Sequence, residues 1–275
     1  MTTSASSLRT LPRGLAAIVA ELEMDQRVLV TTADLEAIRL RAGVATPTKM
    51  LALRLRERGW LLPTAQRGVY EFAPGAHAGA LSSGQVTLPL QAVLHGRPEL
   101  RACLTLQSAA WAMGLADRAP ARMEVAAPDM ATTERLNRLL REDARILTFK
   151  PRLPRSQLRG VPTMAPDSVL VHMAARPRDV RSWSSALEWL PDLAAELTKD
   201  QLHHELAGRP AAVSTRAGYL LSGLRPDLAL RTVLPGHGSV HFGSRKATPQ
   251  RRDARLQVTD SLLPFDPRTL SSVAP

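Results

Sequence analysis

The chain has 275 residues, a formal net charge of +11 and 44% hydrophobic residues. This length exceeds one average domain of roughly 100 to 150 residues and predicts two folded domains. No stretch is apolar enough to span a membrane, and the first residues lack the layout of a secretory signal, so we expect a cytoplasmic protein without a membrane partner. The single cysteine, Cys103, excludes an internal disulfide and is expected to be a small buried hydrophobic side chain.

The basic charge predicts an anionic partner, because a polyanion releases counterions when it binds a basic surface. Nucleic acid is favoured over a membrane. Only four of the 36 basic residues are lysine, and we attribute part of this arginine excess to coding bias. Residues 1–75 hold ten basic and seven acidic side chains, so most of the positive surplus lies further along the chain.

Two short helices are predicted near the start of the chain. Apolar residues at helical spacing predict the first over residues 12–25. Thr31 with Asp34 resembles a capping box, which begins a second helix over 32–42 that stops at Gly43.

A third helix is predicted over residues 47–58. Thr46 followed by Pro47 forms a second capped start, and Gly59 supplies the stop. At 100° per residue, one arc of this helix is expected to pack against the core: Thr48, Leu51, Ala52 and Leu55. Roughly opposite lie Lys49, Leu53 and Arg56.

Two strands are predicted after the third helix, at 60–63 and 69–72, with a basic tip at Arg67. Three short helices followed by such a ribbon describe a winged helix-turn-helix, which we assign to residues 1–75. The third helix is then expected in the major groove of DNA, with the ribbon as the wing. The predicted DNA-contacting residues are Thr46, Thr48, Lys49, Leu53, Arg54, Arg56, Arg58 and Arg67. A solvated helix face and a protein-interaction module remain as alternatives.

Residues 76–84 are predicted to be a linker, because they are small and polar, and residues 85–275 to be a larger second domain. The pattern predicts helices at 88–95, 105–115, 131–142, 166–175, 183–195, 199–207 and 213–224, with strands at 122–127, 144–150, near 159–163 and after 238. Thr198 with Gln201 fits a capping box, and Arg216 is expected to point outward. The fold class is therefore α+β, with an α/β-like second domain.

Basic residues recur in two clusters of the second domain. They are Arg141, Arg145, Lys150, Arg152, Arg155 and Arg159, and then Arg245, Lys246, Arg251, Arg252 and Arg255. The sequence leaves open whether these residues serve solubility or face phosphates or an acidic partner.

No pattern predicts catalysis, a metal site or a cofactor. His203, His204 and Glu205 lack the spacing that places two ligands on one helix face, so we expect a solvated helix surface. His237 and His241 have no third ligand and are expected on a loop and a strand edge. The glycine-rich segment 235–239 is interpreted as a turn, and neither an acidic metal cluster nor a nucleophile elbow is found. We therefore do not expect an enzyme.

Five segments along the chain together resemble a known family. They are RLRERGWL at 54–61, RGVY at 67–70, LQSAAWAMGL at 106–115, GVPTMAPDSVL at 160–170 and RAGYLL at 216–221. In this order they resemble the AbiEi type of antitoxin from type IV toxin-antitoxin systems, which pair a winged-helix N-domain with a larger α/β antitoxin domain.

The resemblance implies a DNA-binding repressor that autoregulates its operon on inverted repeats. It also implies that the second domain neutralises a nucleotidyltransferase-like toxin. The alternative is a protein-interaction module without sequence-specific DNA binding. Neither heptads nor a dimerisation helix is found, so we expect a monomer or weak dimer that cooperates on DNA.

Overall fold

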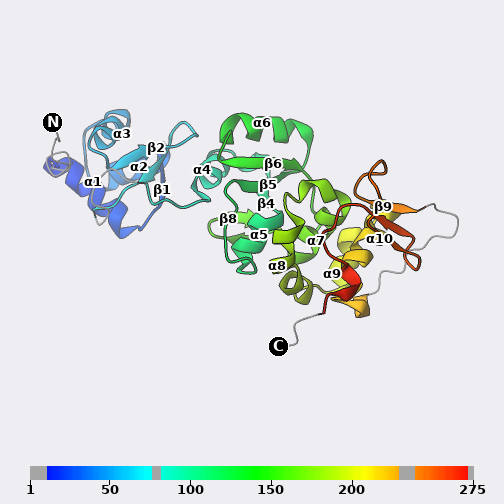
Figure 1. Cartoon of the computed structure of the whole chain (residues 1–275). Helices are drawn as coiled ribbons and strands as arrows, with labels where there is room; N and C mark the ends of the chain where they lie inside the picture. The colour runs from blue at the N-terminus through cyan, green and yellow to red at the C-terminus, as the bar shows by residue number, and fades with distance from the viewer. Residues whose placement is uncertain (1–10, 76–81, 229–238, 272–275) are drawn as a thin grey trace, which may run out of the picture. The chain divides into compact units, whose positions relative to one another are not determined.

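The computed structural model describes residues 11–75, 82–228 and 239–271, and the chain divides into two compact units (Figure 1). The first unit comprises residues 1–100 with 138–141, and the second comprises 101–137 with 142–275. Most of the predicted linker, residues 76–81, lies outside the described part. The predicted domain limits at 75 and 85 stay a prediction.

The first unit begins with a three-helix and three-strand arrangement. Its elements are α1 (Arg13–Met24), β1 (Leu29–Thr31), α2 (Thr32–Arg41), α3 (Thr48–Glu57), β2 (Leu61–Pro63), β3 (Val69–Phe72), α4 (Leu88–Gly96) and a 3-10 turn at Pro98–Leu100. The three predicted helices and both predicted ribbon strands are present, each within two residues of its expected ends. A winged helix-turn-helix is therefore the fold of this unit.

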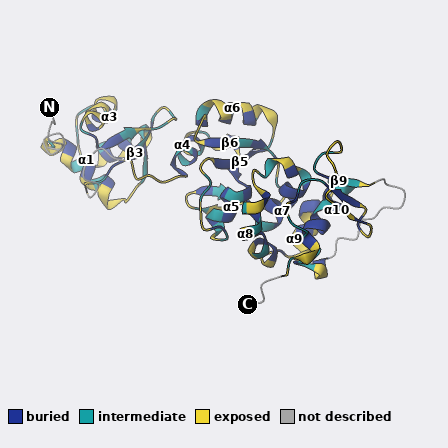
Figure 2. Cartoon of the chain, in the orientation of Figure 1, coloured by how far each residue is buried: buried dark blue, intermediate teal, exposed yellow. Residues whose placement is uncertain are grey.

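One strand of the winged helix was not predicted. β1 pairs antiparallel with β3, which also pairs antiparallel with β2, so the sheet order is β1-β3-β2. β1 has only three residues between two helices, too few to show an alternating pattern. One face of this sheet and all three helices bury a common apolar core, in which Ile18, Leu35 and Leu55 are fully buried (Figure 2).

The ends of the first helices follow local chemistry. The capping box at the start of α2 is confirmed, since the Thr31 hydroxyl accepts the Asp34 N–H at 3.0 Å and the Asp34 carboxylate accepts the Thr31 N–H at 2.8 Å. The prediction that Thr46 caps α3 is wrong. Pro47 occupies the N-cap position, and no side chain bonds the free N–H groups there.

The second unit contains a five-stranded mixed sheet, helices and a small second sheet. Its elements are β4 (Cys103–Leu104), α5 (Leu106–Met113), β5 (Met123–Ala127), α6 (Met130–Leu140), β6 (Ala144–Thr148), β7 (Ser156–Leu158), β8 (Val161–Thr163), α7 (Pro166–Ala175), α8 (Trp183–Ala195), α9 (Lys199–Leu206), α10 (Ala211–Leu220), β9 (Val240–Phe242), β10 (Arg251–Asp253) and β11 (Val258–Asp260). The predicted α+β class with an α/β-like second domain is confirmed.

The five-stranded sheet has the order β6-β5-β4-β8-β7. β5 and β6 run parallel, as do β4 and β8, whereas β4–β5 and β7–β8 are antiparallel. The two-residue strand β4 was missed, because so short a segment carries no periodic signal. Cys103 lies in this strand and is buried as predicted, and burial raises the pKa of its thiol to about 12.

Helix α7 is the central helix of the second unit. It packs against α5, α8, α9 and α10, and residues 167–174 are all buried, which explains why it shows no polar face (Figure 1). α10 also contacts the small sheet, whose order is β10-β11-β9.

Two sequence predictions about side chains in this unit are corrected. Arg216 on α10 does not simply point outward, because its guanidinium donates to the carbonyls of His241 at 2.8 Å and Ala174 at 3.3 Å. Glu205 is not part of a solvated surface: it is fully buried, while His203 and His204 beside it are exposed. In both cases neighbouring elements, distant in the sequence, supply the partners.

Candidate nucleic-acid interface

Helix α3 lies with one face in the core of the winged helix and the other in solvent. Leu51, Ala52 and Leu55 are 1%, 4% and 0% exposed, which confirms that they form the packing arc. Lys49, Leu53 and Arg56 on the other side are exposed. The core contacts therefore determine which face of the helix is free to meet a partner.

The exposed side of α3 carries positive charge together with two apolar side chains, Met50 and Leu53. Lys49, Leu53 and Arg56 are spaced as i, i+4 and i+7, so they form a continuous stripe along the helix. Leu53 is 44% exposed. Arg54 is exposed on a different side of the helix from Arg56. Within the described part of the chain, no acidic side chain pairs with Lys49, Arg54, Arg56 or Arg67.

A polar cluster fixes the start of α3 against α2. The Glu36 carboxylate accepts from the Thr48 hydroxyl and from the Arg39 guanidinium at 2.6 and 3.0 Å, and Arg39 also donates to the Val44 carbonyl at 3.0 Å. The hydrogen bonds from Arg39 and Thr48 lower the pKa of Glu36 to about 2. Thr48 is one of the predicted DNA-contacting residues, and here its hydroxyl is committed to positioning the helix. The Glu36–Arg39 spacing of three was the sequence signal for this cluster, but it was not used.

The other predicted contact residues lie at the ends of α3 and on the wing. Thr46 is half-buried in the turn before α3, and Arg58 is half-buried at the C-terminal end. Arg67 is exposed in the turn between β2 and β3. The next residue, Gly68, accepts the Thr32 N–H at 2.9 Å, which ties the wing to the start of α2.

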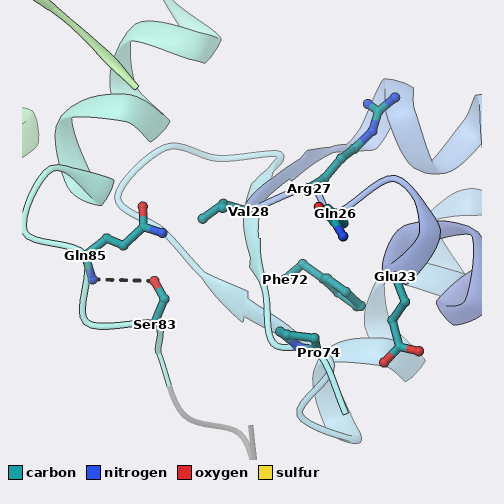
Figure 3. Close-up of a pocket in the computed structure, with 8 residues that line it drawn as sticks. All are labelled: Glu23, Gln26, Arg27, Val28, Phe72, Pro74, Ser83 and Gln85. Atoms are coloured by element: carbon teal, nitrogen blue, oxygen red, sulfur yellow. Dashed lines mark hydrogen bonds between the residues drawn. The ribbon is translucent and has the colours of Figure 1, made fainter. Parts of the chain in front are cut away.

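A surface pocket of about 690 Å³ lies elsewhere in the first unit (Figure 3). Its two charged lining side chains are already bonded within the chain. Glu23 accepts the Gly75 N–H at 2.9 Å, and Arg27 pairs with Asp25 at 3.0 Å and Asp34 at 2.5 Å. None of the predicted DNA-contacting residues lines this pocket, so it is separate from the free face of α3.

Several arginines of the two basic clusters have structural roles in the second unit. Arg145 bonds the Asp179 carbonyl at 2.5 Å, Arg159 lies 4.1 Å over the Trp111 ring, and Arg251 bonds the Leu263 carbonyl at 2.8 Å. Nine of the eleven cluster members are nevertheless exposed: Arg141, Lys150, Arg152, Arg155, Arg159, Arg245, Lys246, Arg252 and Arg255. The clusters are therefore not uniform charged surfaces.

The described residues contain no group of three metal-ligating side chains. His203 and His204 are exposed on α9, and His241 lies in β9. His237 and most of the glycine-rich segment 235–239 fall outside the described part of the chain. Among the described helices, none is both long and apolar enough to cross a membrane.

Comparison with known proteins identifies the family of the chain and a solved structure with a similar fold. A model of the AbiEi antitoxin C-terminal domain matches residues 101–223, and a model of an AbiEi antitoxin transcriptional regulator matches residues 18–73. Neither matched family is a catalytic one. No curated protein matches the chain.

The crystal structure of the RV2827C protein from Mycobacterium tuberculosis has a similar fold. The identity is 24%, the TM-score is 0.73, and the similarity covers 93% of this chain and 94% of that one. The similarity thus extends over both units. Because the regulator and antitoxin matches follow one another along the two units, the chain belongs to the AbiEi family of antitoxin transcriptional regulators.

Proposed function

We propose that this protein is a DNA-binding transcriptional repressor and antitoxin. Its first unit binds operator DNA of its own operon, and its second unit neutralises a cognate nucleotidyltransferase-like toxin. It is not an enzyme and needs no cofactor. The observation that carries the DNA-binding role is the exposed stripe of Lys49, Leu53 and Arg56 on a helix held rigidly by the core.

The stripe has the chemistry of a base-reading surface. Arginine and lysine donate to guanine edges in the major groove, and an apolar side chain contacts the thymine methyl group. Leu53 between two cations therefore predicts an operator in which a thymine lies beside a guanine. Thr48 supports this surface by fixing the start of α3, through its bond to Glu36.

The remaining predicted residues are proposed to contact the flanking phosphates. Arg54 and Arg58 lie on other sides of α3, Thr46 precedes the helix, and Arg67 extends from the wing. Such contacts position the protein on the duplex without reading sequence. Two copies of the chain on an inverted repeat would place two such helices in successive turns of the major groove.

The test of DNA binding uses the full chain and the DNA upstream of its own gene. Fluorescence anisotropy over a range of salt concentrations should give an affinity that falls steeply with salt. Replacing Lys49 or Arg56 with alanine should each cost about 1 to 3 kcal/mol of operator binding if each contacts a base. Arg118→Ala, an exposed arginine of the second unit, is the charge-matched control and should leave the affinity unchanged.

Unchanged affinity in both Lys49→Ala and Arg56→Ala would remove α3 from the DNA interface and favour the protein-interaction alternative.

Antitoxin activity is tested separately, by co-expression with the adjacent gene and scoring of growth rescue. The full chain should rescue growth, and so should a chain with both α3 substitutions. Rescue by residues 1–80 alone would contradict the assignment of neutralisation to the second unit.

A further inference from the structure

A second surface pocket, of about 340 Å³, lies in the second unit where α7 ends. Besides Ala175 and Pro177, its lining consists of Arg176, Arg178, Asp179, Arg216, His241 and Gly243. We call these six residues the arginine pocket. They are close in space because α7, α10 and β9 pack together (Figure 1).

The only carboxylate in the arginine pocket is already committed to another side chain. Asp179 Oδ2 lies 3.2 Å from His172 Nε2, and His172 Nδ1 lies 2.7 Å from the Thr105 hydroxyl. Thr105 and His172 are fully buried. Burial lowers the pKa of His172, so the ring is neutral and donates to Asp179 through Nε2 while Nδ1 accepts from Thr105. The hydrogen bond with His172 and the charge of Arg176 lower the pKa of Asp179 despite its burial, so its carboxylate offsets one positive charge of the pocket.

The three arginines leave the pocket with unbalanced positive charge. Three guanidinium groups and one carboxylate give the lining a formal charge of +2, with His241 counted as neutral. The burial of Arg216 and the nearby charge of Arg245 lower the pKa of Arg216, so Arg245 adds to the positive field. Arg216 is held by the His241 and Ala174 carbonyls, which occupy Nε and Nη1, and among the described residues Nη2 has no acceptor.

Glycine at position 243 keeps one wall of the pocket free of a side chain. Its φ is +108°, and a Cβ atom there would lie 2.6 Å from Ser261 Oγ and 2.9 Å from Leu262 Cβ. A larger residue would have to move this wall, so the shape of the pocket depends on the glycine.

We propose that the arginine pocket binds a phosphate dianion, either free phosphate or a phosphate monoester. Such a group carries close to two negative charges near neutral pH and three acceptor oxygens, which match the lining charge and the three guanidinium groups. A carboxylate or a phosphodiester carries one negative charge and would neutralise only half of the +2 charge of the lining. The inference is independent of DNA binding by α3, since it concerns residues of the second unit alone.

The experiment is calorimetric titration of the full-length protein at constant ionic strength. The probes are inorganic phosphate, adenosine 5′-monophosphate, adenosine 3′,5′-cyclic monophosphate and acetate. The first two contain a dianion, the third is the matched phosphodiester, and the fourth is a carboxylate. We expect the two dianions to bind at least about tenfold more tightly than the other two, because charge-assisted bonds strengthen with anion charge.

The double variant Arg176→Ala/Arg178→Ala removes two exposed arginines of the pocket and spares the bonded Arg216. It should weaken binding of both dianions by about tenfold or more. The control Arg118→Ala/Arg255→Ala removes two exposed arginines that do not line the pocket, and should change affinity by less than about twofold. Equal thermal melting of the two variants excludes unfolding as the cause.

Three results would overturn the proposal. They are equal affinity for the monophosphate and its cyclic diester, equal losses in the two double variants, and no detectable binding of either dianion. Binding of inorganic phosphate but not of the nucleotide keeps the proposal and restricts the ligand to a small phosphate. Binding of both assigns the pocket to a nucleotide or similar monoester.

Discussion

Asp167 carries a buried carboxyl group near the start of α7. The residue is fully buried, and among the described residues neither carboxyl oxygen accepts a hydrogen bond of normal geometry, although backbone N–H groups lie near. Burial raises its pKa to about 6, and the charge of Glu205 adds to this, while Arg225 and the backbone of Thr198 oppose it. The folded chain therefore holds a proton on Asp167 more tightly than the unfolded chain does.

Asp167→Asn should stabilise the protein at neutral pH. Because the folded pKa lies above the unfolded one, the contribution of Asp167 to stability is complete below about pH 4 and is lost as pH rises through about 6. The asparagine has nearly the same shape and no charge, so we expect a gain of up to about 3 kcal/mol at pH 7 that disappears at pH 4. Urea denaturation at the two pH values measures this. An equal difference at both would show that ionisation is not the cause.

Glu205 is a buried carboxylate that differs from Asp167, because both of its oxygens accept hydrogen bonds. One oxygen accepts from the Ser168 hydroxyl at 2.7 Å and from the N–H groups of Arg152 and Leu153 at 2.8 and 3.0 Å, and the other accepts from Arg209. It thereby joins α9 to α7 and to the segment after β6.

Glu205→Ala should destabilise the second unit by about 3 to 5 kcal/mol, since Arg209 loses its carboxylate partner, and the Ser168 hydroxyl and two backbone N–H groups lose their acceptor. His203→Ala on the exposed face of the same helix is the matched control and should change stability by less than about 0.5 kcal/mol. Chemical denaturation monitored by circular dichroism compares the two. A loss in Glu205→Ala no larger than in the control would mean that the bonds add nothing to stability.

At the scale of elements, two glycines with left-handed backbone conformations lie in the turn before α3 and in the turn between β2 and β3. Gly43 after α2 and Gly68 before β3 have φ values of +62° and +79°. A Cβ at Gly43 would meet nothing within 4 Å, whereas at Gly68 it would lie 3.2 Å from the Thr32 hydroxyl. The same backbone conformation is thus combined with two different surroundings.

Gly43→Ala should cost about 1 to 2 kcal/mol from the left-handed conformation alone. Gly68→Ala should cost more, because its Cβ also displaces Thr32, which bonds the Gly68 carbonyl and ties the wing to α2. Thermal denaturation of the two variants ranks them. A larger loss in Gly43→Ala would contradict the close approach at the wing.

At the scale of the whole molecule, the chain contains two compact units. Leu55 belongs to the core of the first unit and is fully buried, while Leu53, two residues earlier on the same helix, is 44% exposed. Replacing each of the two leucines therefore tests the stability of the first unit and its proposed DNA contact separately.

Leu55→Ala should lower the unfolding transition of the first unit by about 2 to 5 kcal/mol and leave that of the second unit unchanged. Leu53→Ala should change neither transition by more than about 0.5 kcal/mol and should still weaken operator binding. Calorimetry and anisotropy on the full chain measure the two effects. A shift of both transitions in Leu55→Ala would show that the units unfold together.

The sequence alone determined the winged helix, because its signals are local. The Thr31–Asp34 capping box, the stops at Gly43 and Gly59, and the apolar spacing of α3 each depend on residues within one or two turns. The five segments that carry the family resemblance are also local, and the matches to the AbiEi models confirm the resemblance. The very short strands β1 and β4 were missed, since two or three residues carry no period.

Only the tertiary structure decided which charged side chains are free. Glu205 and Arg216 look like surface residues in the sequence, but partners tens of residues away bury or bond them. The same holds for Thr48, whose hydroxyl reaches Glu36 on another helix, and for the arginine pocket, which gathers side chains from α7, α10 and β9. Local patterning fixes which face of a helix is apolar and places some ion pairs, such as Glu36 with Arg39, whereas the partners that bury Glu205 and bond Arg216 come from distant segments that no spacing along the chain encodes.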